Sequence, residues 1–101
     1  MNREWLLTML GFAQKAGKLA AGESAVENFL KRDRIRLMIA SMELAEEKKN
    51  MWESQAIQHE IPFYQTEATK AELGLAVGMS PRGIIGIMDD KMAEAIMQRL
   101  Q

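Results

Sequence analysis

Residues 83–96 of the chain read GIIGIMDDKMAEAI, and this stretch carries the pattern that decides the fold. Residues 84–88 are apolar and too few for a helix, which is typical of a strand covered on both faces. Asp89 or Asp90 can cap a helix that starts directly after this strand. The apolar stripe of this helix consists of Ala93, Ile96, Met97 and Leu100. A buried strand followed at once by an amphipathic helix predicts a layered α/β domain.

Two more short strands are predicted upstream of this one. Residues 37–40, LMIA, are apolar throughout and predict a central strand that is buried on both faces. Residues 61–64 predict another short strand, and Pro62 ends the helix before it. Residues 18–21 are interpreted as a short connection between two helices.

The first two helices are predicted from caps and apolar spacing. Asn2 can cap the first helix, and Gly17 suits the left-handed position that ends it. The apolar stripe of the first helix is Trp5, Leu6, Met9, Leu10, Ala13 and Ala16. Ser24 and Glu27 form an S-x-x-E pattern, which predicts a capping box at the start of the second helix.

Two helices are predicted between the remaining strands. Leu44, Met51, Trp52 and Ala56 recur at helical spacing, so this third helix has one buried face. Thr69 and Glu72 form a second capping box, and Gly78 ends the helix that it starts. Strands and helices thus alternate, which predicts a three-layer α/β/α sandwich around a small, partly parallel sheet. Residues 1–101 are expected to form a single domain.

The composition indicates an ordinary globular protein. The chain has 101 residues, of which 48% are hydrophobic and 27% are charged, so there is room for one core. Cysteine is absent, which excludes disulfides and a thiolate nucleophile and favours a reducing cytoplasm. We find no secretory signal and no apolar stretch long enough to span a membrane, so we expect a soluble cytoplasmic protein without a membrane partner.

Charge is divided unequally along the chain. Residues 1–40 contain seven basic and four acidic side chains, whereas residues 41–101 contain six basic and ten acidic ones. A polyanion is therefore expected to bind a surface built largely from the first forty residues.

Catalytic or cofactor chemistry finds little support in the residues. Residues 17–24 fit a phosphate-binding loop except that Glu23 replaces its lysine, and a carboxylate would repel the phosphates. His59 has no neighbouring triad or metal-binding partner, and we expect it on the surface near a helix end. Asp89 and Asp90 are explained by helix capping. We therefore expect no enzyme activity, no cofactor, no metal site and no bound nucleotide.

Two features favour binding to another molecule instead. Met9, Met38, Met51, Met88 and Met97 lie at expected core positions. Met42 and Met79 lie in predicted loops, where they either form an exposed apolar contact surface or are partly buried at the sheet edge. The start of the second helix offers free N–H groups to an anion, and Gly22 allows close approach. The alternative, which the sequence by itself favours, is that Ser24 only caps its own helix. Four basic residues could surround this helix start if the fold brings them together. They are Lys15, Lys18, Lys31 and Arg34.

Four strings together resemble the kink-turn-binding ribosomal-protein family, and in particular its short bacterial members. These strings are LLTMLGFAQKAGKLAAGESAV (6–26), RLMIAS (36–41), ATKAELGLAVG (68–78) and GIIGIMDDKMAEAI (83–96). The third string is the most specific, because Leu73, Gly74, Ala76 and Gly78 match the family pattern L-G-x-A-x-G. The resemblance covers nearly the whole chain and implies a mixed four-stranded sheet and binding to structured RNA, with ribosomal RNA and ribosomal proteins as partners.

The resemblance also implies where the RNA binds. In the family, three segments meet at one end of the domain, and they match residues 22–28, 41–44 and 79–83 here. A helix N-terminus would contact phosphates and base edges, while apolar side chains pack against splayed bases. The residues expected to bind RNA are Lys15, Lys18, Gly22, Glu23, Ser24, Asn28, Lys31, Ser41, Met42, Met79, Pro81 and Arg82.

The chain departs from the family pattern at the second helix. RNA binders of the family resemble G-x-N-E-x-x-K there, and the matching residues are Gly22, Ser24, Ala25 and Asn28. Only the glycine is kept, so weaker or altered RNA binding is the expectation. The alternative is a protein-interaction module that has kept the fold and lost tight RNA binding. A stable dimer that buries Met42 or Met79 would favour this alternative.

Overall fold

The sheet contains four strands in the order β1-β4-β2-β3, so β4 and β2 are central. We describe residues 3–100 of a computed structural model. β2 pairs with β3 in parallel, whereas β4 pairs with both β1 and β2 in antiparallel fashion. The elements are α1 (Arg3–Lys15), β1 (Leu19–Ala21), α2 (Glu23–Lys31), β2 (Leu37–Ala40), α3 (Glu46–Gln58), β3 (Phe63–Gln65), α4 (Lys70–Ala76), β4 (Ile84–Ile87) and α5 (Asp90–Leu100).

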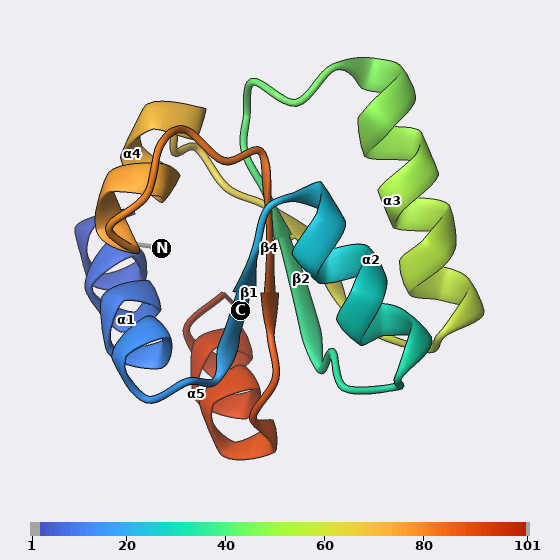
Figure 1. The fold of residues 1–101 in the computed structure, drawn as a ribbon, viewed down its shortest axis with the longest axis horizontal. Helices are drawn as coiled ribbons and strands as arrows, with labels where there is room; N and C mark the ends of the chain where they lie inside the picture. The colour runs from blue at the N-terminus through green and yellow to red at the C-terminus, as the bar shows by residue number, and fades with distance from the viewer. Residues whose placement is uncertain (1–2, 101) are drawn as a thin grey trace.

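Helices cover both faces of this sheet and form two separate cores. α1, α4 and α5 pack on one face, and α2 and α3 pack on the other (Figure 1). Successive residues of β2 serve opposite cores: Leu37 and Ile39 contact the first helix layer, while Met38 and Ala40 contact the second. All four residues of β2 and of β4 are buried. This arrangement confirms the three-layer α/β/α sandwich with a mixed four-stranded sheet.

Strand β1 corrects the interpretation of residues 18–21 as a plain connection. Leu19–Ala21 forms an edge strand, with Leu19 opposite Ile87 and Ala21 opposite Ile85. Three residues are too few to show an alternating pattern, and pairing with β4 makes them a strand.

The start of α2 corrects a second prediction. The capping box of Ser24 and Glu27 is wrong, because the N-cap is Gly22 and no side chain caps this helix. Gly22 has a φ of 95° and its N–H donates to the Ile84 carbonyl over 2.8 Å. The chain therefore passes from β1 directly into α2, and the helix begins before Ser24 can cap it.

Other predicted helix ends are confirmed. Thr69 and Glu72 form the capping box of α4, with hydrogen bonds of 3.1 and 2.9 Å between backbone N–H groups and side-chain oxygens. Asp89 accepts a bond of 2.9 Å from the Met92 N–H at the start of α5. Gly17 and Gly78 have φ values of 70° and 72°. The predicted cap Asn2 lies outside the described residues.

Helix α3 starts later than predicted and buries less. It begins at Glu46, so Leu44 precedes it, and Met51 is 41% exposed instead of buried. Trp52 and Ala56, one turn apart, are the buried residues of α3. Since adjacent residues point about 100° apart on a helix, Met51 faces away when Trp52 faces the sheet. Met38 is buried, and Met9, Met88 and Met97 are half-buried.

Two capping carboxylates predict a pH-dependent contribution to stability. The N–H of Thr69 lowers the pKa of Glu72, and the N–H of Met92 together with Lys18 lowers the pKa of Asp89. A lowered folded-state pKa stabilises the fold above the unfolded-state pKa, and this contribution is lost as the pH falls below about 4. Urea unfolding of the E72Q/D89N variant should therefore show a smaller loss of stability between pH 7 and pH 3 than wild type. The control variant E53Q/E94Q, altered at exposed acids, should behave like wild type; equal pH dependence of all three proteins would contradict this prediction.

Candidate nucleic-acid interface

Three connections meet at one end of the sheet, where β1 and β2 finish and β4 begins. The Gly22 N–H donates to the Ile84 carbonyl, and the Ser41 N–H donates to the Gly83 carbonyl over 2.9 Å. A Cβ atom at Gly83 would lie 2.9 Å from Leu44 Cδ1, so the loop after β2 touches the loop before β4. The fold thus brings together residues 22–28, 41–44 and 79–83, at the top of Figure 1.

Arg82 lies over the start of α2. A Cβ atom at Gly22 would lie 3.1 Å from Arg82 Cδ and 3.2 Å from its Nε. The guanidinium donates to the Ser80 carbonyl and hydroxyl over 3.0 and 2.7 Å, which holds it against its own loop. A shallow hollow results, lined by Ala21, Gly22, Glu23, Ser24, Ala25 and Arg82. No side chain caps α2, so its first N–H groups are not bonded by a capping side chain. These N–H groups and the nearby Arg82 guanidinium together suit the binding of an anion.

Ser41 differs from the other predicted contact residues because it is fully buried. Its hydroxyl donates to the Ala68 carbonyl over 2.9 Å and accepts from the Glu43 N–H over 3.0 Å. Ser41 therefore holds the loop after β2 in place and presents no surface of its own.

The loops carry apolar side chains on their surface. Met42 is 55% exposed and Met79 is 39% exposed, which confirms that these two methionines lie outside the core. Ser24, Asn28 and Pro81 are exposed as well. This end can therefore offer both hydrogen bonds and apolar contact to a ligand.

The structure does not place the predicted basic residues around the start of α2. Lys15 ends α1, Lys31 ends α2 and Lys18 precedes β1, so all three lie at the opposite end of the sheet. Lys18 pairs with Asp89 over 3.3 Å, and Lys31 pairs with Glu27 over 3.5 Å. Arg34 lies at that opposite end too, in the connection from α2 to β2. The reason is that both helices run from the candidate interface to the far end, which carries their last turns away from it.

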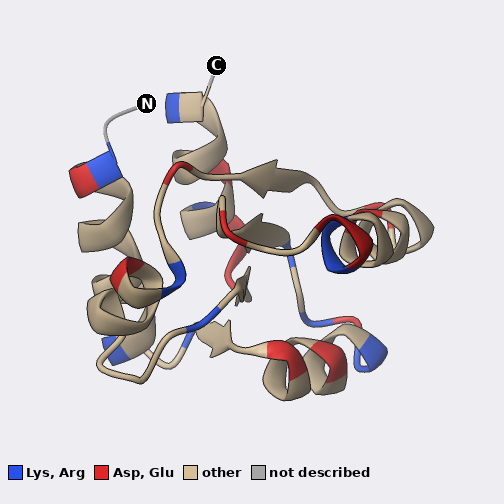
Figure 2. Cartoon of the chain, turned by 90° about the horizontal axis from the view of Figure 1, so that it is seen from above, with Lys and Arg blue, Asp and Glu red and all other residues tan. Residues whose placement is uncertain are grey.

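The candidate interface itself contains more acids than bases. Five acidic and three basic side chains lie in its segments 22–24, 41–48, 66–70 and 77–83. Figure 2 shows the molecule from this end. The basic residues are Lys48, Lys70 and Arg82. Lys48 pairs with Glu23 over 2.7 Å and so offsets the charge of the acid that lines the hollow. Sequence reasoning missed Lys48 and Lys70, because no spacing in the chain relates them to Gly22.

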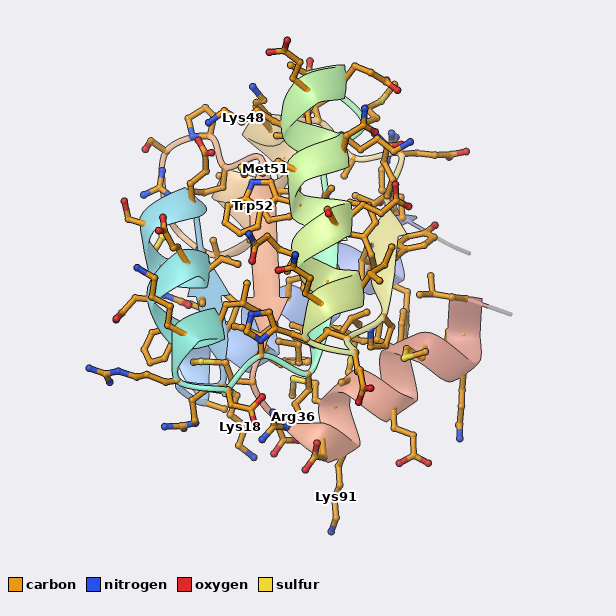
Figure 3. All side chains as sticks on the ribbon, turned by 90° about the vertical axis from the view of Figure 1, so that its right-hand side faces the viewer. Lys18, Arg36, Lys48, Met51, Trp52 and Lys91 are labelled. Atoms are coloured by element: carbon orange, nitrogen blue, oxygen red, sulfur yellow. The ribbon has the colours of Figure 1, made fainter. Side chains whose placement is uncertain are left out.

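A groove between α2 and α3 is the other feature that sequence reasoning missed. It encloses about 270 Å³ and is lined by Glu23, Glu27, Leu30, Lys31, Lys48, Met51, Trp52, Gln55 and His59. Trp52, labelled in Figure 3, is 3% exposed. Over residues 3–100 its indole Nε1 is the buried side-chain polar atom without a hydrogen-bond partner. His59, expected on the surface, is half-buried at the end of α3.

The described residues offer no constellation for metal chemistry. Within residues 3–100, no group of three or more His, Asp or Glu side chains could hold a metal ion. Strand β1 lies between Gly17 and Gly22, so residues 17–24 do not form a continuous phosphate-binding loop. No helix in the described part of the chain is long and apolar enough to cross a membrane.

The fold and the sequence define the class of this protein. A family model described as the ribosomal protein L7Ae/L30e/S12e/Gadd45 family matches residues 6–97, and the chain belongs to this family. A curated relative, the RNA-binding protein YlxQ of Enterococcus faecium, is 23% identical over 100 residues, which cover 99% of this chain and 95% of the relative.

Two solved structures are similar to this chain. A protein of unknown function from Bacillus halodurans C has a TM-score of 0.83 and 25% identity, over 91% of this chain and 92% of that one. The 15.5kD RNA-binding protein of Giardia lamblia has a TM-score of 0.76 and 18% identity, over 97% of this chain and 86% of that one. The second likeness concerns the fold alone.

Proposed function

We propose that this protein binds structured RNA of the kink-turn type, in ribosomal RNA, through the end of the domain where residues 22–28, 41–44 and 79–83 meet. The observation that carries the proposal is the uncapped N-terminus of α2 beneath the Arg82 guanidinium. Family membership and the similarity to the RNA-binding protein YlxQ support the ligand class. The family is one of binding proteins, and we propose no catalytic activity.

Each part of the interface has a role in this proposal. The first N–H groups of α2 and the Arg82 guanidinium would bind a phosphate or a guanine edge. Ser24 and Asn28, on the exposed side of α2, would contribute hydrogen bonds. Met79 and Met42 would pack against bases that the kink removes from the stack.

The test compares three RNAs: a kink-turn with short arms, the same RNA without its sheared G·A pairs, and a plain duplex. We expect the kink-turn to bind about tenfold more tightly than the other two, and R82A to lose about tenfold, which corresponds to one charged contact. R99A is the matched control, because Arg99 lies over the Trp5 ring at 4.4 Å and outside the interface. Equal wild-type affinity for all three RNAs, or unchanged affinity in R82A, would overturn the proposal.

One observation favours the alternative, a protein-interaction module. The α2–α3 groove contains an exposed Met51 and the unpartnered Trp52 N–H, which could donate to a carbonyl of a partner protein. Absence of RNA binding, together with a stable dimer in sedimentation that is lost in M51E in the groove or in M42E/M79E in the loops, would establish this alternative.

A further inference from the structure

The end of the domain opposite the candidate interface is its most basic surface. Four connections lie there: residues 15–18, 31–36, 59–62 and 88–91. They hold seven basic and four acidic side chains, whereas the candidate interface holds three basic and five acidic ones. We call this surface the basic end. Its basic residues are Lys15, Lys18, Lys31, Arg32, Arg34, Arg36 and Lys91.

The sheet register brings these connections together. The Met88 N–H donates to the Lys18 carbonyl over 2.8 Å, and the Arg36 N–H donates to the Ile87 carbonyl over 2.7 Å. Lys18 and Arg36 then pair with Asp89 and Asp90 over 3.3 and 3.0 Å. Figure 3 shows Lys18, Arg36 and Lys91 at the lower edge of the molecule in that view.

In the described part of the chain, several of the basic residues at this end are not used in ion pairs. Within residues 3–100, Lys15, Arg34 and Lys91 form no ion pair, and all three are exposed. Lys15 stabilises the end of α1 through the helix dipole. Lys91, in the first turn of α5, attracts the capping carboxylate of Asp89 electrostatically. Arg34 lies in a connection outside any helix. A bound anion would account for Arg34, and Lys15 and Lys91 would add to the attraction without breaking an ion pair.

The chemistry of the surface favours phosphate groups over a protein partner. Protein interfaces bury apolar and aromatic side chains at their centre. The large exposed hydrophobic residues of the described chain are Phe12, Met42, Met51, Ile57, Leu75 and Met79, and none belongs to the four connections of the basic end. Scattered cations without an apolar centre suit a polyanion with regularly spaced charges, such as an RNA backbone.

We propose that the basic end is a second RNA-binding surface, which holds the phosphate backbone of a helical arm that extends from the kinked RNA. This proposal rests on the proposed function, because the RNA must first bind at the candidate interface for its arm to reach the basic end. The domain is 28 Å long in the direction that joins its two ends, which is vertical in Figure 1, so an arm that reaches from one end to the other needs about ten base pairs at roughly 3 Å each. Short-armed RNA would contact the candidate interface alone.

The experiment measures binding of a short-armed kink-turn RNA and of the same RNA with one arm lengthened to twenty base pairs. The variant K15A/R34A/K91A removes three cations without leaving an acid unpaired. We expect this variant to bind the long-armed RNA about tenfold more weakly than wild type. The slope of log affinity against log salt concentration should fall by about two to three, because each lost phosphate contact reduces it by about one. Binding of the short-armed RNA should stay as in wild type.

The control variant R3A/K49A/R99A makes the same change in net charge away from the basic end and gives up the partly exposed Arg3–Glu72 ion pair. It should bind both RNAs like wild type. Equal losses in both triple variants, or no loss with the long-armed RNA, would overturn this proposal and leave the proposed function intact. If wild type binds neither RNA, the proposed function and this inference are both wrong. Stronger competition by polyglutamate than by a plain RNA duplex would assign the basic end to acidic proteins and overturn the RNA assignment.

Discussion

Replacing Gly74 with alanine should lower the free energy of unfolding by roughly 1–3 kcal/mol, although alanine is the better helix former. Gly74 lies in α4, and the loop that follows this helix passes directly over it. A Cβ atom at Gly74 would lie 2.2 Å from the Ser80 carbonyl oxygen and 2.9 Å from that of Met79. Backbone atoms cannot move aside as a flexible side chain can, so the loop or the helix must shift.

Urea unfolding measures this effect, and Gly11 provides the matched control. Gly11 is also a helical glycine, but its added Cβ atom would meet the Ala76 carbonyl oxygen at 3.2 Å. The G11A variant should therefore stay within about 1 kcal/mol of wild type, because helix propensity offsets the tighter contact. A G74A variant as stable as wild type would contradict the role assigned to the close loop contact. The same variant should bind RNA more weakly, because the displaced loop carries Met79 and Arg82.

Replacing Trp52 with alanine should cost about 3–5 kcal/mol, because the indole fills the core between α3 and the sheet. Replacing it with phenylalanine should cost far less, or stabilise the protein. Phenylalanine keeps most of the packing and removes the buried N–H, whose desolvation without a partner costs about 1–3 kcal/mol.

Urea unfolding followed by circular dichroism compares the two variants without relying on tryptophan fluorescence. If W52F loses as much stability as W52A, the indole N–H has a partner in solution, and the groove is then occupied by water or by a ligand. If W52A is as stable as wild type, Trp52 does not fill the core between α3 and the sheet.

The candidate site could be predicted from the sequence only in part. The resemblance implied that residues 22–28, 41–44 and 79–83 meet, and the structure brings them together. It also places Lys15 and Lys31 at the other end, because a helix of nine or thirteen residues carries its last turn across the whole sheet. Serine is usually found on the surface, yet Ser41 is buried because its hydroxyl donates a hydrogen bond to the Ala68 carbonyl.

The features that the sequence determined by itself are those that depend on neighbouring residues. Uninterrupted apolar runs placed β2 and β4 at the centre of the sheet, and side-chain caps at Thr69 and Asp89 placed the starts of α4 and α5. These features depend on residues within one or two turns of each other, so they can be read without knowing the fold.

The tertiary structure alone decided strand β1, the start of α2, the groove beside Trp52 and the separation of charge between the two ends. β1 exists because β4 supplies its hydrogen bonds, and α2 begins at Glu23 because Gly22 is bonded to Ile84 across the sheet. The basic end forms because four connections, distant in the chain, finish at the same edge of the sheet. Each of these features depends on a contact with an element that is distant in the sequence. Local sequence patterns do not show such contacts.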